Sequence, residues 1–315
     1  MTRFIKPAGL LLLFFSHSLV AGEIVRDYPL DKISDRVYII HGPLETPNVE
    51  NQGFMNNPAI VETSDSIVIV DPGSSLQAGR MLMKQLKSIS DKPVSHVLNT
   101  HIHGDHWLGN QAVAEKYPEV RILAHPAMIA KAEAGEAEVW VKLMHRLTDG
   151  FTGGTRALIP GVAVNDGDSL EVGGVEFRFY APENAHSRTD MMIEVVNDSV
   201  MFLGDNVLYQ RIARMDDGSF SGSIAACDIA LEVGSKLYVP GHGPSGGKTV
   251  VESYRNYLDT LYSQVAAYYE DDLSDFEMKP KIRPSLSAYH NWAGFESEFG
   301  RHISLAILEV EQNSF

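Results

Sequence analysis

The sequence predicts one four-layer α/β domain built from two similar halves. Apolar runs typical of strands alternate with stretches of helical periodicity, and this alternation occurs twice along the chain. No Pro- or Ser-rich linker separates the two halves, so we expect one domain and not two independent ones. The 315 residues are 44% hydrophobic and 21% charged, which is ordinary for a chain with a sizeable core.

The first half is predicted to contain five strands, two helices and an insert. Residues 66–70 are almost wholly apolar, as expected for a strand covered on both faces. Residues 41–57 are rich in Gly, Pro and Asn and predict a long loop of the kind that contacts ligands. Residues 126–158 show helical spacing and predict an insert that either covers a site or packs on the domain. The remaining strands are expected over 37–40, 59–62, 94–98 and 120–125, and the helices over 76–89 and 107–117.

The second half repeats the order of strands followed by helices. Strands are expected over 162–181, 192–196, 199–203 and 236–239, and helices over 224–233, 250–269 and 295–310. Cys227 is the sole cysteine of the chain, which therefore has no internal disulfide. Because Cys227 lies in the apolar run 224–227, we expect a buried structural thiol.

The N-terminus has the pattern of a secretory signal. Arg3 and Lys6 precede an apolar run over 10–15, and small residues follow around 20–22. We therefore predict a signal peptide over 1–22, a mature domain over 23–315, and export to the periplasm. An uncleaved membrane anchor is the alternative, but the apolar run is short for a span. No later segment has the pattern of a transmembrane helix.

The formal net charge of −15 limits the classes of partner. We find no cluster of Lys and Arg of the kind that nucleic-acid-binding proteins carry. An acidic surface also disfavours anionic membranes. A small-molecule substrate is the expected partner, and the sequence leaves the oligomeric state open.

The segment 99–106, Asn-Thr-His-Ile-His-Gly-Asp-His, offers unusual capacity for binding metal. His101 and His103 are two residues apart, so an extended backbone directs both to one side. Asp105 and His106 reach a second point only if the chain turns, and Gly104 is expected to supply that turn. One segment could therefore contribute to two adjacent metal ions.

Three further candidate ligands follow predicted strands. His186 comes after the strand that ends near 181, Asp205 directly follows the apolar run 200–204, and His242 stands in a Pro-Gly-His-Gly turn. Each residue alone is also common in turns. Together with the first cluster, they predict a site at the carboxyl ends of the strands.

These motifs resemble those of the metallo-β-lactamase-fold hydrolases. The His-x-His-x-Asp-His run, His186, Asp205 after Phe-Leu-Gly, and His242 occur in the family's order, from about residue 35 to 270. Asp71 in Asp-Pro-Gly resembles an acidic turn of that family that is structural and not a ligand. The export signal, the loop 53–57 and the tail 292–309 are similar to periplasmic members found near sulfur-oxidation and quinoprotein systems. The resemblance implies a four-layer αββα sandwich with a helical C-terminal tail.

The resemblance also implies a role for each candidate. His101, His103 and His186 would hold one zinc ion; Asp105, His106 and His242 would hold the second; and Asp205 would bridge them. Zinc accepts imidazole and carboxylate ligands, although iron or manganese would also suit this set. Two Zn²⁺ per chain would generate hydroxide near neutral pH, and the catalytic candidate Asp105 would orient it or accept its proton.

The resemblance favours an exported dinuclear zinc hydrolase that cleaves an ester, thioester or amide-like bond. A cysteine occupies the place of Asp205 in the commonest zinc β-lactamases, so a class B-like β-lactamase is an alternative and not the first choice. Mononuclear iron persulfide dioxygenase activity is a second alternative, and a non-enzymatic accessory of a periplasmic redox system is a third. The seven-residue ligand set disfavours the second, and its open His/Asp character disfavours the third.

Residues outside the metal motif are weaker candidates. Solvated, structural or core roles are at least as expected for all of them. Arg188 and Lys248 could bind an anionic group; Asn110, Asn184 and Tyr209 could donate to an oxyanion; Trp140, Phe54 and Met55 could form an apolar wall; and His96, His125 and His145 lie outside the motif.

Overall fold

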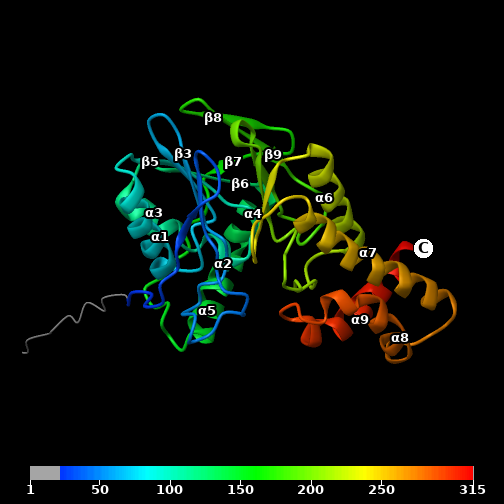
Figure 1. The fold of residues 1–315 in the computed structure, drawn as a ribbon. Coiled ribbons are helices and arrows are strands. Elements are labelled where there is room, and N and C mark those ends of the chain that lie inside the picture. The colour runs from blue at the N-terminus through cyan, green and yellow to red at the C-terminus, as the bar shows by residue number, and fades with distance from the viewer. Residues whose placement is uncertain (1–21, 315) are drawn as a thin grey trace, which may run out of the picture.

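The computed structural model describes residues 22–314 and has the predicted four layers, two β-sheets face to face with helices on both outer sides (Figure 1). The signal peptide predicted over 1–22 lies outside the described residues except for Gly22, so it stays a prediction. Among the residues described, no helix is both long and apolar enough to cross a membrane.

The first sheet contains seven strands in chain order. The first four pair antiparallel, and the last four, counted from β4, pair parallel. The parallel strands place their carboxyl ends at one edge, where ligand sites form in α/β sheets. The strands are β1 (Leu30–Lys32), β2 (Val37–Ile40), β3 (Ala59–Glu62), β4 (Ile67–Val70), β5 (Val94–Leu98), β6 (Arg121–Ala124) and β7 (Val162–Ala163).

The second sheet has five strands in the order β12-β11-β10-β9-β8. Its β11 and β12 are parallel, and the other pairs are antiparallel. The strands are β8 (Ser169–Val172), β9 (Val175–Tyr180), β10 (Met192–Val195), β11 (Val200–Gly204) and β12 (Leu237–Pro240).

Alternating side chains on these strands bind the layers together. In β4, Val68 and Val70 join the core between the sheets, where Phe177 and Phe202 of the second sheet also lie. Ile67 and Ile69 point to the other face and pack with Leu82. A strand buried on both faces must be apolar throughout, which explains the unbroken Ile-Val-Ile-Val run.

Helices cover both outer faces. On the first sheet lie α1 (Leu76–Ile89), capped by Ser75, and α3 (Asn110–Lys116). The outer face of the second sheet packs on α6 (Phe220–Val233), α7 (Thr249–Glu270), α8 (Asp275–Ile282) and α9 (Phe295–Asn313). The insert forms α4 (Pro126–Lys131), a π-helical turn (Ala132–Glu136) and α5 (Ala137–Leu147).

The helix predicted over 107–117 is confirmed as α3, but it begins three residues later than predicted. The chain forms α2 (Gly104–Trp107) and then, after a break, α3. The Asp-Pro-Gly turn takes the backbone groups that a continuous helix would use: Gly73 N–H donates to the His106 carbonyl at 3.1 Å, and Gly109 N–H donates to the Gly73 carbonyl at 2.8 Å. These two hydrogen bonds separate α2 from α3 and hold the segment 101–106 beside the turn that follows β4.

Candidate metal centre

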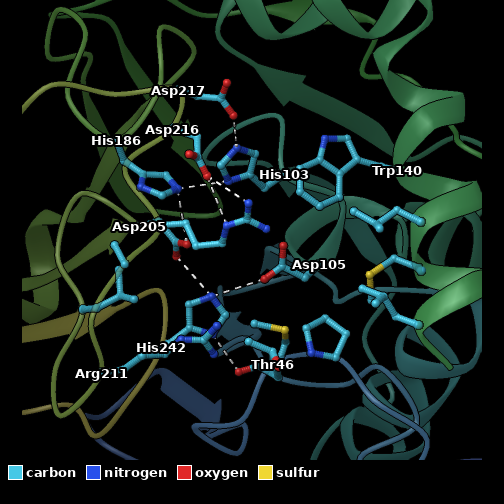
Figure 2. A pocket seen from close by; sticks show the side chains of 18 of the residues that line it. Thr46, His103, Asp105, Trp140, His186, Asp205, Arg211, Asp216, Asp217 and His242 are labelled. Carbon is cyan, nitrogen blue, oxygen red and sulfur yellow. Dashed lines mark hydrogen bonds and ion pairs between the residues drawn. The ribbon is translucent and has the colours of Figure 1, made fainter. Parts of the chain in front are cut away.

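The seven predicted ligands converge at the carboxyl ends of β5, β11 and β12. Figure 2 shows those that line the pocket, namely His103, Asp105, His186, Asp205 and His242, around one central space. His101 and His103 follow β5, and Asp105 and His106 lie on α2. His186 lies between β9 and β10, Asp205 follows β11, and His242 follows β12.

The donor atoms form two groups, each with atoms within 4.8 Å of one another. The first contains His101, His103, His186 and Asp205; the second contains Asp105, His106 and His242. Both groups combine residues from the first half of the chain with residues from the second half. The resemblance implies the same sets of histidines, with Asp205 assigned to neither set alone.

Asp205 lies between the two groups. Its Oδ1 is 3.1 Å from His106 Nε2 and 3.3 Å from His242 Nε2, in the second group. Its Oδ2 faces the first group, 3.6 Å from His186 Nε2. One carboxylate therefore directs one oxygen at each group.

Hydrogen bonds on the outer side orient the imidazole rings. Nδ1 of His106 lies 2.8 Å from Oδ2 of Asp71, and Nδ1 of His242 lies 2.9 Å from the carbonyl oxygen of Met55. Because carboxylate and carbonyl oxygens accept, both rings carry a proton on Nδ1 and direct Nε2 inward, where it can bind a metal ion once it is deprotonated. Asp71 therefore has the structural role that the resemblance implies.

The inward nitrogen and oxygen atoms converge as metal ligands do. His106 Nε2 lies 3.4 Å from His242 Nε2, and the carboxylates of Asp205 and Asp105 raise the pKa of both rings against the effect of burial. His101 Nε2 is buried without a hydrogen-bond partner. Burial also lowers the pKa of His186 to about 3 and that of His101 well below its usual range, so both rings are neutral, as ligands must be. The donor set therefore suits two divalent cations.

Gly104 has a different role from the one predicted. It begins α2 without a left-handed backbone conformation. A Cβ at this position would lie 2.7 Å from Cβ of Trp140 on α5. The glycine is needed because the metal motif packs directly against the insert.

A pocket of about 540 Å³ opens over the two groups. One wall is apolar and comes mainly from α5, while cationic and acidic residues of the loop after β11, joined by Arg301 of α9, line another part. The insert therefore forms part of the site. The apolar side chains are Pro47, Met55, Trp140, Leu143, Met144, Leu147, Leu208 and Ala213, and the charged ones outside the two ligand groups are Arg211, Arg214, Asp216, Asp217 and Arg301.

Most of the weaker candidates lie outside this pocket. Only Trp140 and Met55 of that set line it. Phe54 packs in the core beneath α1, the Asn110 amide bonds to Asn99, and Lys248 pairs with Glu252. Arg188, Asn184, Tyr209, His96, His125 and His145 are also absent from the lining, and Cys227 is buried in α6.

Sequence reasoning missed Arg211, Asp217 and Arg301. Asp217 contacts a metal-group residue directly, with Oδ2 3.3 Å from His103 Nε2. No local motif marks these three residues, because the fold of the loop after β11 and its contacts with α9 bring them to the pocket. The position of Arg211 only six residues beyond Asp205 is the sole signal.

Comparisons with known proteins agree with the fold. The model of the metallo-beta-lactamase superfamily matches residues 52–242. The metallo-beta-lactamase from Pontibacter korlensis has a similar structure, with a TM-score of 0.59 and 19% identity over 74% of this chain and 99% of that one. The sec-alkylsulfatase Pisa1 from Pseudomonas sp. is similar with a TM-score of 0.64 and 17% identity over 80% of this chain and 45% of that one.

Curated relatives match in sequence over parts of their length. The chain is 22% identical to alkyl/aryl-sulfatase BDS1 of Saccharomyces cerevisiae, over 84% of this chain and 46% of that protein. It is 26% identical to atrochrysone carboxyl ACP thioesterase of Aspergillus fumigatus, over 52% of this chain and 32% of that protein. It is 36% identical to linear primary-alkylsulfatase of Pseudomonas sp., over 22% of this chain and 14% of that protein. The chain thus spans less than half the length of each of these relatives. Since the superfamily match covers more than half of this chain and the fold agrees with it, the chain belongs to the metallo-beta-lactamase superfamily.

Proposed function

We propose that this protein is a dinuclear zinc hydrolase that cleaves an ester-type bond, with carboxylic esters and thioesters as the first choices. The observation on which the proposal depends is the position of Asp205, with one oxygen directed at each of two His/Asp groups. A single-metal site needs no carboxylate that faces two ligand groups. The names of the relatives, thioesterases and alkylsulfatases, support ester-type chemistry.

In this proposal the chain holds one ion with His101, His103 and His186 and the other with Asp105, His106 and His242. The two ions would supply Lewis acidity that activates water and the scissile group near neutral pH. Zinc suits the imidazole-rich set best, and iron or manganese is the alternative.

Asp105 is the proposed proton acceptor. Its carboxylate lines the pocket and lies 3.2 Å from His242 Nε2. Burial alone would raise the pKa of Asp105, but His106 and His242 outweigh it and hold the pKa below its usual value. An ionised carboxylate beside the pocket can orient an attacking water and take its proton.

Two alternatives separate from this proposal by metal content and substrate. A persulfide dioxygenase would hold one iron with two histidines and a carboxylate, which leaves the second group unused. A class B-like β-lactamase would share the dinuclear site, so the substrate distinguishes it.

Metal analysis and Asp205→Ala test the proposal. We expect about two zinc ions per wild-type chain and hydrolysis of a glutathione thioester or an aryl ester in a panel that includes a cephalosporin and a phosphodiester. Asp205→Ala should lose metal and activity together, whereas the exposed control Asp259→Ala should keep both. One iron per chain, or an Asp205→Ala variant with full metal and turnover, would contradict the proposal.

The proposal includes export to the periplasm, supported by the charge and hydropathy pattern of residues 1–22. Cell fractionation with N-terminal sequencing of the mature protein tests it. Recovery of an uncleaved chain in the cytosol would contradict it.

A further inference from the structure

Arg211 is a buried cation in the wall of the pocket. It lies in the loop after β11 and its residue is only 9% exposed. The backbone of Arg211 bridges to Ala293 before α9, and its Nη1 donates to the carbonyl oxygen of Glu45 at 3.3 Å. One neutral acceptor satisfies only a fraction of the five N–H donors of a guanidinium group.

The other arginines that line the pocket already share a carboxylate partner. Arg214 and Arg301 both form ion pairs with Asp216. Asp217 lies beside His103. Within the described part of the chain, Arg211 has no carboxylate within 4.0 Å, which distinguishes it from Arg214 and Arg301.

The acidic residues near Arg211 do not form an ion pair with its guanidinium group. Asp105 and Asp205 interact with it electrostatically at longer range, as do Glu298 and Glu45. With two divalent ions bound, Asp105 and Asp205 would be ligands and the whole centre would carry net positive charge. A buried charge without a close partner is costly, so the pocket around Arg211 is built to receive an anionic group.

The opposite side of the pocket is apolar. Trp140, Leu143, Met144 and Leu147 recur at helical spacing on one face of α5. The Trp140 ring lies 4.9 Å from the ring of His103, so this wall borders the first metal group. In Figure 2, Trp140 and Arg211 lie on opposite sides of Asp105 and Asp205.

We propose that the pocket binds an amphiphilic anion, with Arg211 holding a carboxylate, sulfate or sulfonate group and the α5 wall holding a hydrocarbon part. This inference rests on the proposed function, because it places the bond to be cleaved between these two parts, over the metal groups. A planar guanidinium binds such oxyanions through two parallel hydrogen bonds, and the apolar wall gains affinity with each added methylene. Arg211 is therefore a specificity-determining residue.

Isothermal titration of the zinc-loaded protein with octane-1-sulfonate, which is not hydrolysed, tests the inference. Ethanesulfonate lacks the hydrocarbon chain, and 1-octanol lacks the charge. We expect octane-1-sulfonate to bind more tightly than either. Arg211→Met should weaken its binding about ten-fold or more, and Arg211→Lys should weaken it less. Leu143→Ser should weaken the binding of octane-1-sulfonate and leave the binding of ethanesulfonate unchanged.

Arg214→Met is the matched control, because it removes a pocket arginine that already has a carboxylate partner. We expect its affinity to stay within about two-fold of wild type. Equal losses in Arg211→Met and Arg214→Met, or wild-type binding of 1-octanol as tight as that of octane-1-sulfonate, would overturn the inference. The second result needs no variant and so holds even if Arg211→Met does not fold, which its melting temperature reveals. Failure of the proposed function looks different: the ester and thioester panel would be inert while sulfonate binding still depended on Arg211.

Discussion

Asp217 lies beside His103 although 114 residues separate them along the chain, with Oδ2 of Asp217 3.3 Å from Nε2 of His103. The carboxylate accepts the proton of Nε2, and the other ring nitrogen, Nδ1, then faces His186 Nε2 at 3.0 Å. His103 is thus the one ring of its group that is oriented from the outside by a side chain of the loop after β11. Arg301 of α9 braces this loop through Asp216.

Asp217→Asn is expected to weaken metal binding at the first group by about ten-fold, since outer carboxylates fix the ring and raise the basicity of a histidine ligand. Competition with a chromogenic chelator measures this affinity. Asp259→Asn, an exposed aspartate on α7, is the control and should bind metal like wild type. Unchanged zinc affinity in Asp217→Asn would remove the orienting role.

Gly241→Ala is expected to disturb the bridge directly. A Cβ at this position would overlap Oδ1 of Asp205, the oxygen that faces His106 and His242. We expect the zinc content to fall from about two ions toward one or none, because the carboxylate must rotate away. Gly247→Ala has open space around the added methyl group and should retain full metal content. Metal analysis of both variants gives the answer.

The stability of the C-terminal helices should depend on pH through His302. Its Nδ1 accepts from the Tyr257 hydroxyl and its Nε2–H donates to the Ala213 carbonyl, and burial lowers its pKa from 6.5 to about 4. In the unfolded chain His302 binds a proton below about pH 6.5, whereas in the folded chain it binds one only below about pH 4. Stability therefore falls as pH falls through this window, by about 3 kcal/mol at most.

His302→Gln can form both hydrogen bonds but does not titrate. Urea unfolding at pH 7.5 and pH 5 should show a larger loss of stability for wild type than for His302→Gln. Because the metal-group histidines titrate equally in both proteins, the difference isolates His302. Parallel pH profiles would contradict the assignment.

Metal removal should lower the melting temperature. Lone pairs converge in the two groups, and an ion that binds only the folded chain stabilises it by about 4 kcal/mol at a thousand-fold excess over its dissociation constant. Treatment with a chelator followed by dialysis should lower the melting temperature, and added zinc should restore it. A melting temperature that does not respond to either step would argue against filled sites.

The sequence predicts those parts of the site that depend on local spacing. The run 101–106, His186, Asp205 and His242 each follow an apolar strand, and strand ends meet at one edge of a sheet. The fold class follows from the same alternation of strands and helices and is confirmed by the structure. Local patterns such as these are independent of how the remainder of the chain folds.

Contacts between distant segments could not be predicted in the same way. The break between α2 and α3 arises because the Gly109 backbone N–H donates to the Gly73 carbonyl. The sequence of residues 107–117 contains no signal for this break. The sequence around Gly104 indicates a turn, but the glycine is required because Trp140 packs against it, and this contact is not visible in the local sequence. In contrast, the start of α8 has a local sequence signal, since Ser274 and Glu277 form a capping box.

The mixed origin of the two ligand groups has a topological consequence. His106 and His242 belong to one group and are 136 residues apart, so a bound ion would close a very long loop of chain. In a chain whose sole cysteine rules out an internal disulfide, the ions would act as reversible cross-links between the halves. Such cross-links restrict the unfolded ensemble most when the loop is long. Unlike disulfides, these cross-links would form and break with the concentration of free metal ion and not with the redox state.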